Sequence, residues 1–436
     1  MMFKKFVFVL LISFFAISLY AYDAPVAKIE DDSSLRAILK EKWFLEAPNR
    51  VIALKPLLYT LPGGDKIEVR VESNKNEFGI VLARERNKAY PGWAQGSWAL
   101  VRRRDTGASV RIRAFLRSDP NVYVQFRPMT ADKSVMDVVV YDAYLVYSLP
   151  TPFSFDKLLT LPVEDALSAI GDKFPRAYFE PTPALYKDTW KFVADVQKHL
   201  SGLTFRDDGA IDEAGNYVFI ETGERQSGTP GLNCSGFAKW VIDGLLRPVT
   251  GERLSIEPLK AHYGNRGNSF TALYDDTRDP FFGLDWIRNL AAVAGSTLLS
   301  PACGTLDEFE VRTWRFPSLM RRSNAGVAGA TESYAGFMED AGFNIEGIYP
   351  LLYTLAIDEP DRFYLAAVND ASGPRPSLRQ YFHVAILAPY FNEQGNFEIA
   401  VFESAAETTF RSFRTRYPKD TFVNLVRIPV GNQFEP

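Results

Sequence analysis

Residues 232–246 read LNCSGFAKWVIDGLL, a short segment of small and polar residues followed by an apolar run. Apolar side chains recur in this run at the spacing of one helix face, at Phe237, Trp240, Val241 and Leu245. Asn233 is a residue type that caps helix N-termini, and Gly231 interrupts regular structure just before it. The pattern predicts a buried helix that begins at Cys234 and ends before Pro248.

The position of Cys234 at the start of this helix bears on its chemistry. A thiol in the first turn lies beside free backbone N–H groups and the positive end of the helix dipole, which stabilise a thiolate and lower the pKa of the thiol. Ser235 and Gly236 are small, so the turn can approach a sheet or a substrate closely. This arrangement favours a nucleophile. The alternative is a disulfide between Cys234 and Cys303, the two cysteines of the sequence.

A thiolate nucleophile needs a base within hydrogen-bond reach, and the sequence holds three histidines. His199 lies late in a predicted amphipathic helix, where a surface cation is the simpler interpretation. His262 lies in a segment typical of a loop. His383 opens a predicted strand, 383–388, that carries the small Ala385 on the same face. His383 is therefore the candidate base.

The pairing of two predicted strands suggests a third candidate site residue. Residues 392–395 are turn-forming and separate the His383 strand from a predicted strand that ends at Glu403. A turn centred on residue 393 pairs Glu403 directly with His383. A centre at 394 puts residue 405 opposite His383 and leaves Glu403 diagonal to it on the same face. Either register lets Glu403 accept a hydrogen bond from the imidazole, and the alternative is an exposed glutamate at a strand end.

These residues resemble a known family. Residues 233–237, Asn-Cys-Ser-Gly-Phe, are similar to the Asp-Cys-Ser-Gly-apolar motif of the NlpC-type cysteine peptidases of bacterial cell walls. Residues 383–387, His-Val-Ala-Ile-Leu, resemble their His-Val-Gly-Ile strand, and residues 401–404 fall where the family has a third polar residue. The resemblance implies a papain-like fold and hydrolysis of an amide in peptidoglycan stem peptides.

The resemblance also implies roles for single residues: Cys234 as nucleophile, His383 as base and Glu403 as the group that orients the imidazole. The sequence departs from the family in three ways. Asn233 replaces the usual Asp, and Glu403 replaces the usual His, Asn or Gln. The segment between the Cys and His motifs is longer than in the family, which implies a large insertion at about 248–360.

The N-terminus has the features of a secretory signal over residues 1–21. Lys4 and Lys5 precede an apolar run, and Ala21 is a small residue that signal peptidases accept. We expect an exported protein, periplasmic or extracellular, with no membrane span after the signal is cleaved. An uncleaved N-terminal anchor is the alternative.

The rest of the chain divides by pattern into three regions. Short alternating strands such as 67–71 and 110–116, with others at 121–126 and 138–147, predict a small antiparallel β-rich domain over 25–150. A proline-punctuated connector over 151–202 holds two predicted helices, 163–171 and 184–201. Residues 203–436 read as an α+β domain. Its predicted elements are helices at 234–247, 284–299 and 331–341, and strands at 362–368, 383–388, 397–403 and 422–430.

Charge limits the range of partners. The formal net charge of -4 and the pI of about 5.7 argue against a nucleic-acid partner. Residues 84–117 nevertheless hold nine Lys or Arg against two acidic residues, with Trp93 and Trp98 among them. A solvated sheet face is the favoured interpretation, and a face for an anionic glycan is the alternative. The sequence has no metal-binding or nucleotide-binding motif, so we expect no cofactor.

Together these patterns predict a papain-like α+β cysteine hydrolase domain preceded by a small antiparallel β domain. The expected activity is exported cleavage of a wall peptide amide by a Cys nucleophile and a His base. Two alternatives stay open at this point. One is a catalytically inactive envelope binding protein with a Cys234–Cys303 disulfide, and the other is an acyl transferase on the same fold.

Overall fold

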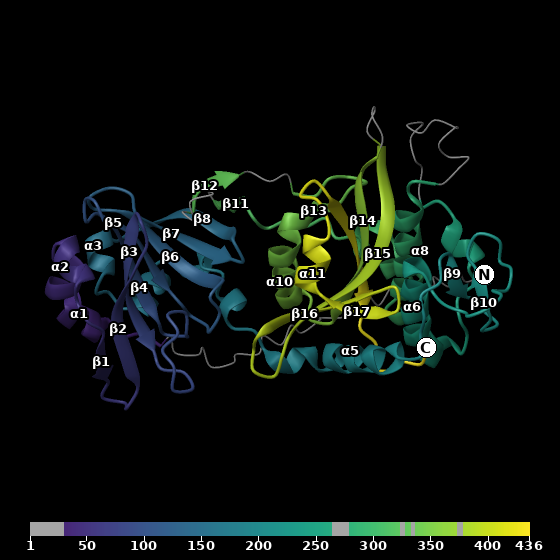
Figure 1. The fold of residues 1–436 in the computed structure, drawn as a ribbon, viewed down its shortest axis with the longest axis horizontal. Coiled ribbons are helices and arrows are strands. Elements are labelled where there is room, and N and C mark those ends of the chain that lie inside the picture. The colour runs from purple at the N-terminus through teal and green to yellow at the C-terminus, as the bar shows by residue number, and fades with distance from the viewer. Residues whose placement is uncertain (1–29, 264–278, 323–327, 333–335, 373–377) are drawn as a thin grey trace, which may run out of the picture.

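The computed structural model describes residues 30–263, 279–322, 328–332, 336–372 and 378–436, and the expected signal segment lies outside them. Two lobes lie side by side along the long axis, one built mainly on a β-sheet and one in which helices flank a second sheet (Figure 1). The α+β class with a large antiparallel sheet in the N-terminal part is confirmed. Within the described residues, every helix is too short or too polar to cross a membrane.

The first eight strands of the N-terminal sheet follow one another in chain order, each antiparallel to the next. They are β1 (Leu57–Thr60), β2 (Lys66–Ser73), β3 (Glu77–Arg84), β4 (Trp98–Arg103), β5 (Ser109–Ala114), β6 (Val122–Pro128), β7 (Ser134–Val140) and β8 (Ala143–Thr151). Alternate side chains, such as Ile67 and Val69, are buried on one face. Against that face pack Trp43 and Phe44 from the N-terminal helical segment. This segment comprises α1 (Ser33–Leu39), η1 (Lys40–Leu45) and α2 (Pro48–Ile52).

The expected single strand at 138–147 is wrong. A hairpin turn at Tyr141 and Asp142, both with positive φ of 47° and 65°, separates β7 from β8. Two consecutive positive φ values are typical of a type I′ turn, whose twist suits a tight antiparallel hairpin. The sequence there lacks glycine, so the usual turn signal is absent.

The connector over 151–202 divides between the lobes. Its first half packs on the N-terminal lobe, where the buried Arg36 side chain of α1 donates to the carbonyls of Leu159 (3.1 Å) and Leu161 (2.6 Å). Its second half packs on the C-terminal lobe, where the Trp190 indole donates to the carbonyl of Phe391 (3.0 Å). The two predicted helices are present as α4 (Val163–Ser168) and α5 (Lys187–Leu200), each with a neighbouring 3-10 turn.

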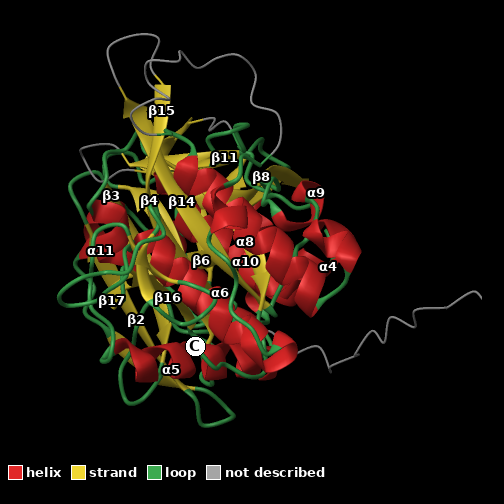
Figure 2. Cartoon of the chain, turned by 90° about the vertical axis from the view of Figure 1, so that its right-hand side faces the viewer, coloured by secondary structure: helices red, strands yellow, loops and turns green. Residues whose placement is uncertain are grey.

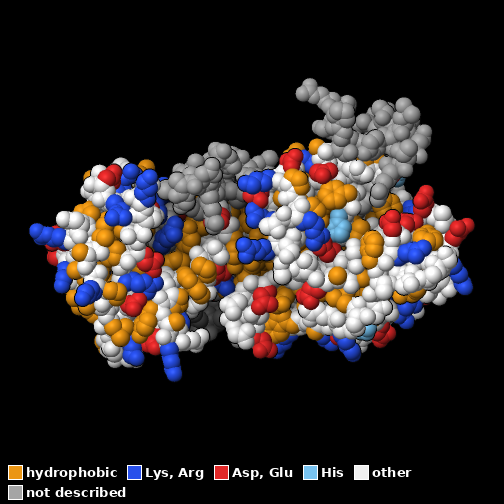
Figure 3. Space-filling view, viewed as in Figure 1, with side chains coloured by type: hydrophobic (Ala, Val, Ile, Leu, Met, Phe, Trp, Pro, Cys, Tyr) orange, Lys and Arg blue, Asp and Glu red, His pale blue; other side chains and the backbone are white. Residues whose placement is uncertain are grey.

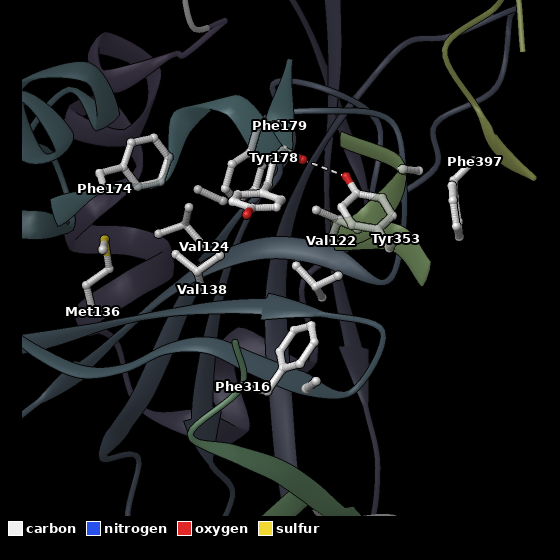
Figure 4. Close-up of a cluster of buried hydrophobic side chains, with 14 of the residues drawn as sticks. Val122, Val124, Met136, Val138, Phe174, Tyr178, Phe179, Phe316, Tyr353 and Phe397 are labelled. Atoms are coloured by element: carbon white, nitrogen blue, oxygen red, sulfur yellow. Dashed lines mark hydrogen bonds between the residues drawn. The ribbon is translucent and has the colours of Figure 1, made fainter. Parts of the chain in front are cut away.

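One hydrophobic core continues from the N-terminal sheet into the C-terminal lobe (Figure 4). Val122 and Val138 from the sheet lie in the same cluster as Phe397 and Tyr353 from the other lobe. The Tyr353 hydroxyl donates to the carbonyl of Tyr178 at 2.6 Å, the dashed contact in Figure 4. The two lobes are therefore packed together rather than joined by a free linker.

A six-stranded antiparallel sheet forms the C-terminal lobe in the order β13-β18-β14-β15-β16-β17. These strands are β13 (Phe343–Asn344), β14 (Arg362–Ser372), β15 (Leu378–Phe391), β16 (Phe397–Glu403), β17 (Ala406–Thr409) and β18 (Phe422–Pro429). All four strands expected in this region are present, and β14 and β15 are longer than predicted.

Helices cover both faces of this sheet. On one face, α6 (Cys234–Thr250) and α8 (Phe282–Leu298) pack against each other and on Leu365 and Ile386 (Figure 2). On the other face, α10 (Ile348–Asp358) and α11 (Phe410–Thr415) pack on the side chains that alternate with these, such as Ala366. Because successive side chains of each strand point to opposite faces of the sheet, each strand contributes to two separate hydrophobic cores.

The stretch 248–360, expected as an insertion, supplies both α8 and α10 and hence part of each core. The same stretch also contains a hairpin that pairs with the sheet of the N-terminal lobe. Strand β11 (Ser318–Arg322) pairs with β8 and with β12 (Ala328–Glu332), so the N-terminal sheet has ten strands. The helix predicted at 331–341 is wrong, because β12 runs to Glu332 and residues 336–342 form a turn, while 333–335 lie outside the described residues.

Candidate active site

Cys234 is the first residue of α6, as predicted. The side chain of Asn233 accepts a hydrogen bond from the Gly236 N–H at 2.8 Å and so caps the helix. Gly236 lies directly against β9 (Gly209–Ile211), where a Cβ atom would be 2.0 Å from the Gly209 carbonyl oxygen. The indole N–H of Trp286 on α8 donates to the Ser235 carbonyl at 2.9 Å. The start of the helix is therefore fixed on three sides.

Helix α6 does not end before Pro248, as the sequence suggested, but runs to Thr250. Pro248 has no N–H to donate to the carbonyl of Gly244. The N–H of Glu435, in the C-terminal tail, donates to that carbonyl instead at 2.7 Å. The tail thus satisfies the acceptor that proline leaves open, and the helix continues.

His383 lies on β15 where this strand extends beyond its neighbour. The ladder between β15 and β16 ends at the pair Ile386 and Phe402, so His383 and Val384 lie past it. Cys234 lies close enough to this stretch that the His383 side chain and the Val384 N–H both act on the pKa of its thiol. The side chain of His383 is 17% exposed, so the site is open to solvent on one side.

Glu403 completes the arrangement. Its Oε2 lies 2.7 Å from His383 Nε2, and its side chain is 7% exposed. The pairs Leu387–Val401 and Phe391–Phe397 show that the hairpin is centred on residue 394, the second of the two predicted registers. Glu403 is therefore the diagonal neighbour of His383 on the same face. Because Glu403 occupies Nε2, the Nδ1 atom is the ring nitrogen that remains for Cys234.

Arg416 is a member of this arrangement that sequence reasoning missed. It follows α11, and its guanidinium donates to Glu403 Oε1 at 2.6 Å. Burial alone raises the pKa of Glu403, but hydrogen bonds and charge from His383 and Arg416 lower it below its ordinary value. Arg416 thus keeps the carboxylate ionised and holds its second oxygen. No sequence motif links position 416 to the Cys and His motifs.

The charges of Cys234 and His383 are coupled. Burial raises the pKa of Cys234, yet hydrogen bonds and charge from His383, the Val384 N–H and the Ser235 hydroxyl outweigh it and lower the pKa. Burial lowers the pKa of His383, while contacts with Cys234 and Glu403 raise it to about 9. At neutral pH these shifts favour a thiolate beside an imidazolium.

Backbone donors for an oxyanion lie at the same place. The Gly236 N–H is bonded to Asn233 Oδ1 and the Phe237 N–H to the Asn233 carbonyl. The first-turn N–H groups of Cys234 and Ser235 remain at the positive end of the helix dipole. They are the donors next to the sulfur atom that can stabilise negative charge on a carbonyl oxygen.

The other candidate residues lie elsewhere. His199 is on α5, with Nδ1 2.8 Å from the Asp195 carbonyl, and His262 is exposed, 3.4 Å from Asp279. Both cysteines are free thiols, so the disulfide alternative is wrong for this structure. Cys303 lies in η6 (Pro301–Gly304), with its sulfur 3.4 Å from the Ser300 hydroxyl.

Part of the basic run at 84–117 is neutralised by acidic residues from other segments. Arg84 pairs with Asp32 and Asp65, both at 2.5 Å, and Arg111 pairs with Glu77 at 2.5 Å. Trp98 is buried in the core, while Trp93 is 42% exposed. On the face of this lobe that Figure 3 shows, Lys and Arg atoms are scattered among acidic and hydrophobic atoms rather than gathered in one patch. Arg84, Arg102 and Arg117 are buried, so the expected solvated face does not describe the whole run.

Comparison with known proteins adds one finding. A family model described as a domain of unknown function, DUF8515, matches residues 25–178, less than half of the chain. The matched range ends within η3 (Arg176–Phe179). No curated protein and no solved structure matches the chain.

Proposed function

We propose that this chain is an exported cysteine hydrolase that cleaves an amide bond in peptidoglycan stem peptides. The observation that carries the proposal is the line of contacts from the Cys234 thiol through His383 to Glu403, with 2.7 Å between His383 Nε2 and Glu403 Oε2. Acyl transfer to sulfur requires a thiolate nucleophile, a base that contacts it and a group that orients the base, and these three residues can fill those roles.

A papain-like architecture is part of this proposal. It is supported by a helix that begins at the nucleophile and packs on an antiparallel sheet that carries the base. The wall-peptide substrate rests on the similarity of residues 233–237 and 383–387 to the NlpC-type motifs. The exported location rests on the signal pattern of residues 1–21.

The proposed reaction has two halves. The Cys234 thiolate attacks the amide carbonyl carbon and forms a C–S bond, while the carbonyl electron pair moves to the oxygen, which accepts hydrogen bonds from the N–H groups of Cys234 and Ser235. The C–N bond then breaks, and the His383 imidazolium gives its proton to the departing amine. A water molecule loses a proton to His383, attacks the thioester and releases the carboxylic acid and the thiolate.

The test is digestion of purified peptidoglycan by the full chain, with new amine and carboxyl ends identified by mass spectrometry. Cys234→Ala is expected to abolish cleavage, and Cys303→Ala is the matched control that retains it. Wall cleavage that persists in Cys234→Ala contradicts the proposal. An added primary amine that appears in the product in place of a new carboxylate assigns the chain to acyl transfer rather than hydrolysis.

A further inference from the structure

The outer face of the N-terminal sheet, opposite its core, carries a groove of about 680 Å³. Small side chains form its floor, at Gly79 and Val81 on β3 and Ala99 and Val101 on β4. Side chains with polar or aromatic groups form its walls, at Arg70, Glu72, Ser73, Asn74, Glu77, Trp93, Arg111, Arg113 and Phe115. This volume lies within the range of about 300–1,000 Å³ that is usual for ligand sites.

The groove has an uneven charge. Arg70 pairs with Glu72 at 2.6 Å and Arg111 with Glu77 at 2.5 Å, so these charges are balanced. Arg113 stacks on the Tyr123 ring at 4.6 Å and approaches Gln125 Oε1 at 3.4 Å, and no carboxylate among the described residues forms an ion pair with it. Arg113 is therefore a partly buried guanidinium on the groove wall that has no ion pair among the described residues.

Trp93 supplies a second recognition feature. Its side chain lines the groove and is 42% exposed, although tryptophan is among the side chains that gain most from burial. A flat indole on a groove wall suits a ligand with flat apolar faces. On the same walls, Glu72 Oε1 accepts from Arg70, which leaves Oε2 to accept a hydrogen bond from a hydroxyl group, and the Glu72 and Glu77 carboxylates disfavour a ligand with dense negative charge.

From these features we infer that this groove binds a glycan chain whose sugars carry isolated carboxylates, with Trp93 against a sugar ring and Arg113 on a carboxylate. Guanidinium binds carboxylate through two parallel hydrogen bonds, which suits a single acidic substituent. An acidic peptide fits less well. The floor strands β3 and β4 are paired on both sides, so they offer no free backbone edge to an extended peptide.

The inference extends the proposed function to a second site, but its test does not depend on catalysis. The full chain carrying Cys234→Ala is titrated with peptide-free peptidoglycan glycan strands, with chitohexaose as a carboxylate-free glycan and polyglutamate as an acidic peptide. The expected result is saturable binding of the glycan strands, at least tenfold weaker binding of chitohexaose, and no binding of polyglutamate.

Variants then assign the site. Trp93→Ala and Arg113→Gln are each expected to weaken glycan binding about tenfold or more, while Arg50→Gln, at an exposed arginine on α2, which packs on the core face of the sheet, leaves it unchanged. Thermal unfolding of each variant verifies folding, and Trp93→Phe is expected to restore much of the affinity. Absence of glycan binding, equal binding of polyglutamate, or binding that both groove variants retain overturns the inference. Each of these outcomes leaves the peptidoglycan digestion test of Cys234 unaffected.

Discussion

The charge state of the Cys234–His383 pair decides whether this chain has a reactive sulfur atom. Burial on its own opposes a thiolate, and the structure offsets it with an imidazolium, a backbone N–H and a hydroxyl around one sulfur. The opposing shifts of the two pKa values open a pH window in which both groups are charged. Its lower bound is the depressed pKa of Cys234, and its upper bound is the pKa of His383, about 9.

This window predicts the labelling behaviour of Cys234. At pH 6 the wild-type thiol is expected to react quickly with iodoacetamide, because the imidazolium stabilises the thiolate. In His383→Ala the charge that lowers the pKa of Cys234 is gone and burial raises that pKa, so the labelling rate falls by about a hundredfold. Mass spectrometry of the labelled peptides measures both rates, with Cys303 as the internal control. Equal rates at Cys234 in the two proteins contradict the ion pair.

The contact between Glu403 and His383 predicts how the alkaline limit of the pH–activity profile changes when Glu403 is replaced. Glu403 is one of the groups that raise the pKa of His383, so the imidazolium persists to about pH 9 and activity is lost as the pH rises through that value. Glu403→Gln keeps an acceptor but removes the charge, and the alkaline limit of kcat/KM is expected to fall by about one pH unit with kcat reduced at least tenfold.

The matched control for this change is Glu407→Gln on the adjacent strand, where the carboxylate binds only the exposed Gln197 among the described residues. It is expected to leave the pH profile unchanged. A Glu403→Gln enzyme whose alkaline limit stays near pH 9 shows that the carboxylate does not act on the imidazole.

The sequence indicated part of this site for physical reasons that act locally. The cap at Asn233 and the apolar face of the following helix are local signals, so the start of α6 was predictable. Side chains alternate between the two faces of β16, so both predicted registers placed Glu403 on the same face as His383. Arg416 was not predictable, because it reaches Glu403 from the end of α11, and a long arginine side chain leaves no pattern in the sequence that shows where its tip lies.

The position of helix α6 depends on the contact between its first turn and β9. Gly236→Ala would put a methyl group 2.0 Å from the Gly209 carbonyl oxygen and 2.9 Å from the Ala210 Cα, and both are backbone atoms that cannot rotate away. The helix must move, which is expected to lower the free energy of unfolding by about 1–3 kcal/mol and to slow turnover, because Cys234 moves with it.

The control is Gly202→Ala, where the nearest atom to a new Cβ lies 3.7 Å away and the backbone is not left-handed. It is expected to be neutral or slightly stabilising in urea unfolding. Equal stability of the two variants would show that the close packing of α6 on β9 does not hold the nucleophile in place.

Errors of prediction at the level of helices and strands share one cause. A helix at 331–341 and a single strand at 138–147 were inferred from local composition, but turn geometry and long-range pairing determine both segments. Strand β11 joins β8 from about 170 residues further along the chain, and local patterns carry no information on such a partner. The four strands of the C-terminal sheet were predictable because their apolar runs are long and bounded by turns.

The continuity of the core between the lobes predicts that the molecule unfolds as one unit. Arg117 in the N-terminal lobe donates to the Tyr353 hydroxyl at 2.8 Å and to the Gly395 carbonyl at 2.6 Å, and it stacks on the Phe391 ring at 5.0 Å. Tyr141 adds an aromatic contact to Tyr353 at 5.5 Å. These contacts couple the β-rich lobe to the hairpin that carries His383 and Glu403.

Arg117→Ala removes two hydrogen bonds from a charged group and leaves a void between the lobes. It is expected to lower the free energy of unfolding by about 3 kcal/mol and to split the single calorimetric transition into two. Arg103→Ala removes an exposed pair with Asp105 (3.4 Å) and is the control, with an expected change within about 0.5 kcal/mol. A single unshifted transition in Arg117→Ala would mean that the remaining aromatic contacts are enough to join the lobes. Two separate transitions in the wild type would mean that the shared core does not couple them.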